Sequence, residues 1–212
     1  MSLVQRPGVP EQLAPDLARD SSLRDPRRGE ADVLLAGWLS NARAVPSPNS
    51  DARPGGETPT LVVVHAISLP PEQFGGPGVE QLFTNALDPQ EHPYYATICH
   101  LRVSAHFFIR RDGELIQFVS ADERAWHAGV SSWEGRERCN DFSIGIELEG
   151  CDTLPFEPVQ YERLEELLGI LRANYPIRGV VGHSDIAPGR KTDPGPCFDW
   201  ARLEGGGLVA RR

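Results

Sequence analysis

Hydrophobic and polar positions in the middle of the chain repeat with the periods of strands and helices. Residues 60–65 (TLVVVH) form a short continuous apolar run, which is typical of a buried central strand. Residues 142–149 alternate instead, and this pattern predicts a strand with two different faces. One face carries Ile144, Ile146 and Leu148, whereas the other carries Ser143, Gly145, Glu147 and Glu149. Residues 178–182 (RGVVG) predict a further short strand.

Helical spacing marks two other segments. Residues 157–175 predict an amphipathic helix that begins at Pro158. Its apolar stripe consists of Leu164, Leu167, Leu168, Leu171 and Tyr175. Residues 77–87 predict a second helix, and residues 105–119 predict a hairpin around the Asp112-Gly113 step. Strands mixed with helices in this way predict an α/β fold, a single domain with a central mixed β-sheet flanked by helices.

The two ends of the chain differ from this middle. Residues 1–30 contain four prolines, five basic and five acidic residues and almost no apolar periodicity. Such a composition buries too little surface to offset the entropy lost on ordering, so we expect a flexible tail at 1–30. We also expect a loose end at 206–212, where glycine and arginine dominate. The folded domain is therefore expected at 31–205.

Composition and charge exclude several classes of protein. The formal net charge of −9 argues against a nucleic-acid partner and against a membrane-surface binder. No apolar run approaches the roughly 20 residues that a membrane span needs. The first residues lack the pattern of a secretory signal, so we expect a cytoplasmic protein whose four cysteines are reduced thiols. No obligate protein partner is evident.

Two histidines and one aspartate form the first candidate site. His65 ends the predicted buried strand, His183 follows the strand at 178–182, and Asp193 lies ten residues later in a loop rich in proline and glycine. Two histidines and a carboxylate are the ligand set of a catalytic zinc site that keeps a fourth position for water. The alternative is that both histidines are hydrogen-bonded core residues.

Lys191 and two glutamates could act beside such a site. Lys191 is the only lysine of the chain, and it lies two residues before Asp193, where it could hold a developing oxyanion. Its alternative role is a surface ion pair of little energetic value. Glu147 and Glu149 share one face of a strand; Glu147 is nearer the apolar centre and better placed for proton transfer, and we expect Glu149 to face solvent. The same pair could also suit a glycosidase, or both could be ordinary solvent-face residues.

The remaining histidines and cysteines are weaker candidates. His106 and His127 each adjoin aromatic residues, which favours a packing or supporting role over ligation. His92 and His100 lie in a predicted loop. Cys197 follows a Pro-Gly-Pro turn near Asp193, and we interpret it as structural.

Four long stretches of the chain resemble one known family. They are VVVHAISLPPEQFGGP, LRVSAHFFIRRDGE, RAWHAGVSSWEGRERCNDFSIGIELEG and GHSDIAPGRKTDPGPCFDW, and the resemblance covers about residues 37–203. They resemble the cytoplasmic N-acetylmuramoyl-L-alanine amidases of cell-wall recycling, in the zinc amidase type 2 family. That family shares its fold with T7-type phage lysozyme and the peptidoglycan recognition proteins. The resemblance implies hydrolysis of the amide between the lactyl group of (1,6-anhydro)-N-acetylmuramic acid and L-alanine of the stem peptide.

The resemblance also implies roles for individual residues. His65, His183 and Asp193 would bind one Zn2+ per chain, and Glu147 and Lys191 would be the catalytic pair. The residues that would contact the small anhydromuropeptide substrate are Tyr94, Arg102, Trp126, Arg138 and Ala187. One position departs from the family pattern, because the chain has HAIS where we expect HNIS. Ala66 therefore removes an amide donor and acceptor from the substrate cleft.

Three alternatives to this function stay open from the sequence. One is a non-catalytic peptidoglycan-recognition module, although such binders typically lack a metal ligand and this chain has all three. Another is a glycosidase that uses Glu147 and Glu149. The third is an exported amidase that acts on the intact cell wall, which the missing signal sequence disfavours.

Overall fold

A six-stranded mixed sheet forms the centre of the described part of the chain. The computed structural model describes residues 33–206, with the side chains of 204–206 excepted. The tail expected at 1–30 and the last residues, 207–212, lie outside the described residues. The sheet order is β12 (Gly179–Gly182), β5 (Leu61–Ile67), β11 (Ser143–Glu149), β6 (Phe107–Ile109), β7 (Leu115–Gln117) and β3 (Arg43–Ala44). The first four strands are parallel, whereas β7 is antiparallel to β6, so the expected α/β fold with a mixed sheet is confirmed.

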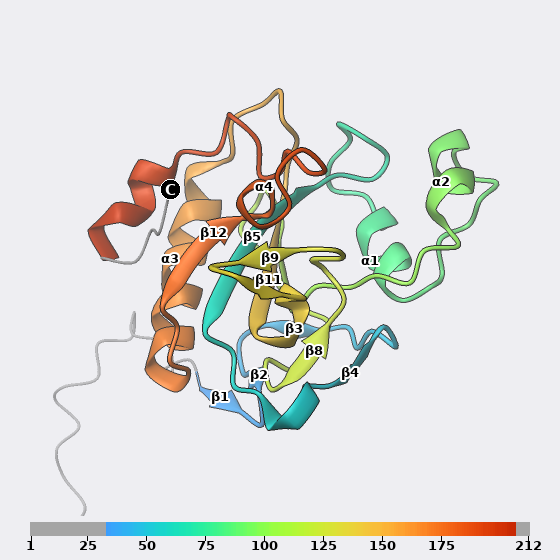
Figure 1. Cartoon of the computed structure of the whole chain (residues 1–212). Helices are drawn as coiled ribbons and strands as arrows, with labels where there is room; N and C mark the ends of the chain where they lie inside the picture. Colours follow the sequence, from blue (N-terminus) through green and yellow to red (C-terminus); the bar gives the residue numbers. More distant parts are fainter. Residues whose placement is uncertain (1–32, 207–212) are drawn as a thin grey trace, which may run out of the picture. The chain divides into compact units, whose positions relative to one another are not determined.

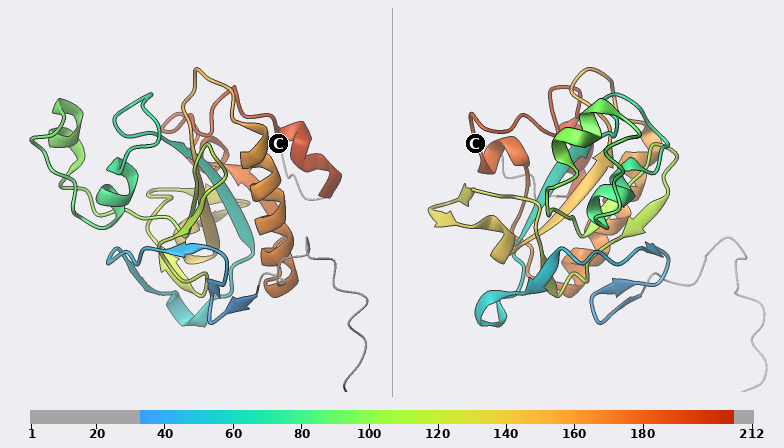
Figure 2. Two further views of the ribbon diagram at one scale, coloured as in Figure 1. Left: turned by 180° about the vertical axis from the view of Figure 1, so that it is seen from behind. Right: turned by 90° about the vertical axis from the view of Figure 1, so that its right-hand side faces the viewer.

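Helix α3 (Pro158–Asn174) covers one face of this sheet (Figures 1 and 2). Pro158 occupies its first turn, and the Gln160 side chain accepts from the backbone N–H of Glu157 at 2.9 Å, which caps the start of the helix. The predicted leucine stripe packs on the apolar faces of β5 and β11. Each leucine buried in this way stabilises the fold by about 1.5–3 kcal/mol. Tyr175, expected in the stripe, instead ends the helix and is only partly buried.

The opposite face of the sheet holds two smaller apolar clusters. One lies beneath α1 (Gly78–Phe83) and contains Phe108 and Ile116. The other contains Val63 and Val181 and packs against α4 (His183–Ile186). Because side chains alternate along a strand, residues of β5 and β11 at odd positions point to this face. The chemistry-bearing residues of the two longest strands thus lie on the face away from α3.

Short elements complete the described residues. They are β1 (Leu34–Leu35), β2 (Trp38–Leu39), β4 (Ser50–Ala52), β8 (Glu123–Ala125), β9 (Ser132–Trp133), β10 (Arg136–Glu137), α2 (Pro93–Ile98) and the 3-10 helices η1 (Pro54–Gly56), η2 (Cys139–Asp141) and η3 (Trp200–Gly206). The predicted hairpin is present, and Gly113 takes a φ of 87° in its turn. The loop expected around His92 instead contains α2, whose first turn is capped by the His92 side chain.

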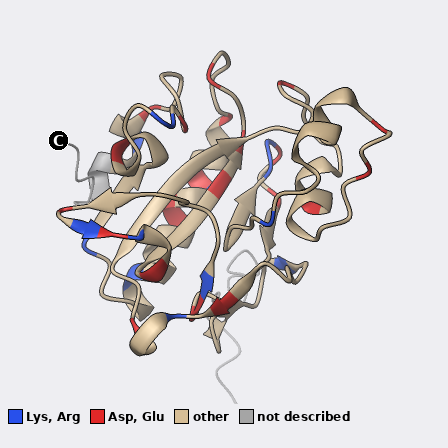
Figure 3. Ribbon diagram, turned by 45° about the vertical axis from the view of Figure 1, so that its right-hand side comes forward, with Lys and Arg blue, Asp and Glu red and all other residues tan. Residues whose placement is uncertain are grey.

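Charged residues of both signs are interspersed over these elements (Figure 3). Many of them form ion pairs, such as those of Arg43 and Arg110 with Glu80. None of the helices in residues 33–206 has the length and apolar character that crossing a membrane requires.

Candidate active site

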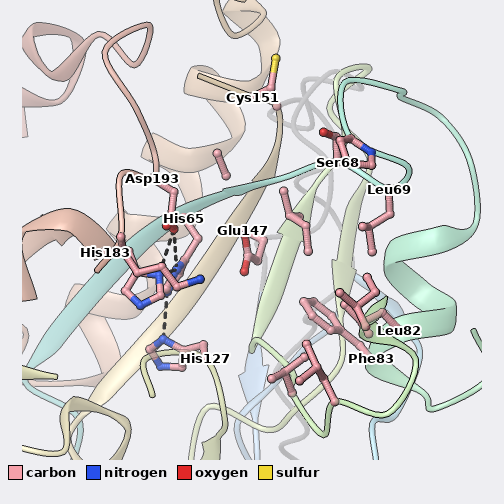
Figure 4. A pocket seen from close by; sticks show the side chains of 18 of the residues that line it. His65, Ser68, Leu69, Leu82, Phe83, His127, Glu147, Cys151, His183 and Asp193 are labelled. Atoms are coloured by element: carbon pink, nitrogen blue, oxygen red, sulfur yellow. Dashed lines mark hydrogen bonds and ion pairs between the residues drawn. The ribbon is translucent and has the colours of Figure 1, made fainter. Parts of the chain in front are cut away.

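His65, His183 and Asp193 converge at one edge of the sheet (Figure 4). Strands β5 and β12 are parallel neighbours, so His65 near the end of one lies beside His183, which directly follows the other. The Nδ1 atoms of the two imidazoles are 3.0 Å apart. Asp193 Oδ2 lies 3.1 Å from His65 Nδ1 and 3.0 Å from His183 Nδ1. These three atoms are close enough to share one metal ion.

A chain of hydrogen bonds behind His65 fixes which of its nitrogens carries the proton. The Ser143 hydroxyl donates to the Cys139 carbonyl at 2.5 Å, so its oxygen can accept from His127 Nε2 at 3.3 Å. His127 Nδ1 is then an acceptor, and His65 Nε2, 2.9 Å away, donates to it. His65 Nδ1 is left with a lone pair that points at His183 and Asp193.

The second histidine is oriented in the same sense. His183 Nε2 donates to the carbonyl of Ala128 at 3.2 Å, which leaves the lone pair of its Nδ1 for the centre of the cluster. The Asp193 carboxylate can only accept when it is ionised. Three acceptors therefore face one another without a proton between them, and a cation is the partner that satisfies all three.

Electrostatics agree with this assignment of protons. Burial lowers the pKa of His65 to about 4, which keeps the imidazole neutral at physiological pH. Burial opposes ionisation of Asp193, but the close contacts of its carboxylate with the two imidazoles outweigh burial and hold its pKa below the ordinary value. A neutral imidazole and an ionised carboxylate are the forms that bind metal.

Glu147 lies in the same cavity as this triad (Figure 4). Glu147 pairs in register with His65 across the β5–β11 pair, and it is 8 % exposed. Its Oε2 is buried and has no hydrogen-bond partner among residues 33–206. Burial and, to a smaller extent, Asp193 raise the pKa of Glu147 well above its ordinary value, and Lys191 opposes the rise. A carboxyl with a raised pKa holds a proton more readily than an ordinary glutamate, which suits a group that takes up and passes on a proton.

Lys191 lies on the exposed rim of the cavity that contains Glu147 and the triad. Its backbone N–H donates to the Ala187 carbonyl, which closes the turn after α4. Its ammonium is close enough to Glu147 and His65 to affect the pKa of both. The structure therefore brings together all five residues expected at the metal and catalytic positions.

The cavity has a volume of about 520 Å³ and two unlike sides. One side carries the polar groups described above. The other is an apolar wall made by Leu69, Leu82, Phe83, Ile98, Leu101 and Val103. Tyr94 and Trp126, both expected at the substrate, line this cavity, as does Ala66. The Trp126 indole is fixed from behind by donating to Asp51 at 3.1 Å.

Three expected substrate contacts lie elsewhere. Arg138 and Ala187 line a second cavity of about 520 Å³, together with Arg190. Arg102 is exposed and, within the described part of the chain, lines neither cavity; its guanidinium donates to the carbonyls of Cys99 and Leu101.

The expectation that Glu149 faces solvent is wrong. Glu149 is 3 % exposed, and its two oxygens accept from the backbone N–H groups of Gly75 at 2.6 Å and Arg111 at 3.1 Å. It lines a separate cavity with Phe74, Gly75, Arg110, Arg111, Asp112 and Glu114. The Glu149 carboxylate holds the loop that contains Gly75 against the sheet. Glu147 therefore lies in different surroundings from Glu149.

Several residues around the site were not assigned to it from the sequence. Ser68, Cys151 and Asp152 line the cavity, and Asn140 and Ser143 support it from outside. Their only sequence signal was that they lie near residues already singled out. His127 was expected to pack or support, and its hydrogen bond to His65 agrees with that expectation.

Comparison with known proteins identifies the family. Residues 55–196 match the model of the family described as N-acetylmuramoyl-L-alanine amidase. The chain belongs to this amidase family. It is 62 % identical over 173 residues to the 1,6-anhydro-N-acetylmuramyl-L-alanine amidase AmpD of Escherichia coli (strain K12). The matched segment covers 81 % of this chain and 94 % of that relative.

Solved structures of the family agree with this identification. A crystal structure described as a Se-Met AmpD derivative superimposes on this amidase with a TM-score of 0.81 and 60 % identity, over 84 % of this chain and 99 % of that one. The amidase AmiD from E. coli, solved with anhydro-N-acetylmuramic acid-L-Ala-D-gamma-Glu-L-Lys, gives a TM-score of 0.53 and 33 % identity, over 76 % and 62 % of the two chains.

Proposed function

We propose that this chain is a zinc-dependent amidase that cleaves the bond between the lactyl group of 1,6-anhydro-N-acetylmuramic acid and L-alanine of the stem peptide, in peptidoglycan recycling. The single observation that carries the proposal is the buried Glu147 carboxyl beside a cluster of three metal-ligating side chains. The name of the AmpD relative described above supplies the substrate class.

The donor set suits one zinc ion held by His65, His183 and Asp193. Two ligands about 2.0–2.1 Å from one ion at the tetrahedral angle lie about 3.3 Å apart, and the ligand atoms here are 3.0–3.1 Å apart. The hydrogen bonds behind both imidazoles leave the inward nitrogens free of protons. Three ligands leave a fourth position open to the cavity.

In this proposal Glu147 transfers the proton and Lys191 stabilises the developing negative charge. Zinc would supply Lewis acidity and lower the pKa of a water in its open position to about 7. Glu147 Oε2 takes a proton from the water whose oxygen bonds to the lactyl carbonyl carbon. Lys191 stabilises the negative charge that develops on the carbonyl oxygen. Glu147 then gives the proton to the L-alanine nitrogen as the carbon–nitrogen bond breaks.

Substrate would lie across the cavity and its neighbour. The apolar wall, with Tyr94 and Trp126, offers a surface for the non-polar faces of the sugar and lactyl groups. Arg138 in the second cavity, and Arg102 beside the first, can pair with peptide carboxylates. Ala187 would contact the peptide at the turn between the two cavities.

Two alternative functions are less well supported. A glycosidase would need Glu149 as its second carboxyl group, but Glu149 is held by two backbone donors in a different cavity. A recognition module would not need a buried carboxyl with a raised pKa beside metal ligands. We further propose that the enzyme acts in the cytoplasm on soluble fragments rather than on intact wall, which makes the relatives' 1,6-anhydro substrate the relevant one.

The bond that is cleaved can be tested directly by mass spectrometry in water enriched in 18O. Soluble anhydromuramyl-peptide should yield free peptide with no label and anhydromuramic acid with one 18O in its new carboxylate. Release of a shortened sugar would contradict the amidase. Faster cleavage of whole sacculi than of the soluble substrate would contradict the recycling role.

A further inference from the structure

The dipeptide His127–Ala128 contacts both of the proposed histidine ligands at the ring nitrogens that face away from the cluster. His127 Nδ1 accepts from His65 Nε2 at 2.9 Å, and the Ala128 carbonyl accepts from His183 Nε2 at 3.2 Å. Both residues of the dipeptide are buried. One short segment thus accepts a hydrogen bond from Nε2 of both imidazoles, and the Nδ1 atom of each ring faces the cluster.

A single side chain fixes the backbone of this dipeptide. Asn140 Oδ1 accepts from the N–H of His127 at 3.1 Å and from the N–H of Ala128 at 2.7 Å. The Arg190 guanidinium adds a 2.7 Å hydrogen bond to the Ala128 carbonyl. Because both N–H groups share one acceptor, neither residue can rotate without breaking a hydrogen bond, and the two outer contacts are set together.

Strand β11 fixes the His127 ring from below. Gly145 lies directly beneath the ring, and a Cβ at this position would come within 2.4 Å of His127 Cγ. Ser143, two residues earlier on the same face, accepts from His127 Nε2. The ring therefore has a defined place against the strand, and its own proton has a defined partner.

We propose that His127, held by Asn140, Ser143 and Gly145, is a positioning residue that fixes the ring orientation and tautomer of His65, and that Ala128 does the same for His183. This proposal rests on the proposed metal site. It assigns a role to residues that do not themselves bind the ion. Outer hydrogen-bond partners of metal-bound histidines typically contribute 10–100-fold in metal affinity.

The test is the zinc affinity of the full-length protein, measured by competition with a chromophoric chelator. His127→Leu removes the acceptor and should weaken zinc binding about 10–100-fold. His127→Asn returns an oxygen to the position of Nδ1 and should restore most of the affinity. The visible spectrum of bound Co2+ should change in His127→Leu and return toward that of the parent in His127→Asn.

His106→Asn is the matched control. His106 is also buried, and its ring centroid lies 5.7 Å from that of His127, but its ring contacts Arg53, Gly145 and Glu123 rather than a proposed ligand. It should lose stability and keep the zinc affinity of the parent. If His127→Leu does not fold, Asn140→Leu against Asn140→Asp gives the same comparison, because Asp keeps the shared acceptor.

The possible failures can be distinguished. A parent protein that binds zinc, with His127→Leu binding it equally tightly, would overturn the positioning role and leave the metal site intact. Equal losses in His127→Leu and His106→Asn would also overturn it, because a general packing defect would then explain both. A parent that binds no zinc would overturn the metal site and this proposal together.

Discussion

Replacing Gly145 with alanine tests whether the strand beneath the site leaves room for His127. The new Cβ would lie 2.4 Å from His127 Cγ and 2.6 Å from its Nδ1, whereas ordinary contacts begin near 3.4 Å. The ring must therefore move by about 1 Å, and overpacking of this kind costs about 1–3 kcal/mol of unfolding free energy. The same movement would stretch the 2.9 Å hydrogen bond to His65, so zinc affinity should fall about 10–100-fold.

Gly169→Ala provides a matched control for this prediction. Gly169 lies in α3, and a Cβ there would meet nothing within 4 Å. Alanine should stabilise the helix by up to about 1 kcal/mol and leave zinc binding unchanged. Denaturant unfolding of the metal-free proteins and zinc competition would measure both quantities. A Gly145→Ala protein with the stability and zinc affinity of the parent would refute the reasoning.

Three further substitutions test the catalytic pair and the core. Glu147→Gln should keep zinc and lose about 10²–10⁴-fold in kcat. Because folding raises the pKa of Glu147, the folded chain binds this proton more tightly than the unfolded chain. The unfolding free energy of the metal-free parent should therefore fall as pH rises above 4.5. In Glu147→Gln, which has no such proton, the unfolding free energy should depend less on pH over the same range. Lys191→Arg should retain zinc but lose most of kcat, since a planar guanidinium does not replace a compact ammonium; normal turnover would remove Lys191 from its role. Leu171 is fully buried on the face of α3 that packs against the sheet, so Leu171→Ala should cost about 2–5 kcal/mol in denaturant unfolding, and a loss below 1 kcal/mol would contradict the packing.

Periodic patterns made part of the fold predictable. The stripe on α3 reflects burial of one face of the helix, whereas the alternation on β11 separates apolar side chains that pack against α3 from polar side chains on the opposite face, which is buried as well. The structure has both elements within a few residues of the predicted bounds. Short elements such as α2 and β8 were missed because three to six residues carry too little pattern, and tertiary contacts decide their conformation.

The site was predictable to a different extent. Residue types and their places at strand ends indicated His65, His183 and Asp193, but their convergence depends on the pairing of β5 with β12, which is not local in sequence. Glu149 was misjudged for the same reason, because the Gly75 loop that covers it comes from more than 70 residues earlier. The hydrogen bonds that Asn140 accepts from the backbone of His127 and Ala128 could not be predicted from the sequence, because they form only when the chain is folded.

The central claim is a catalytic zinc site, and the most direct measurement is a zinc titration of the metal-free protein with amidase activity read on the same samples. Activity on soluble anhydromuramyl-peptide should rise linearly with added zinc and stop rising at one ion per chain. Activity that is already full in metal-free protein, or that stays absent when one zinc is bound, would contradict the account.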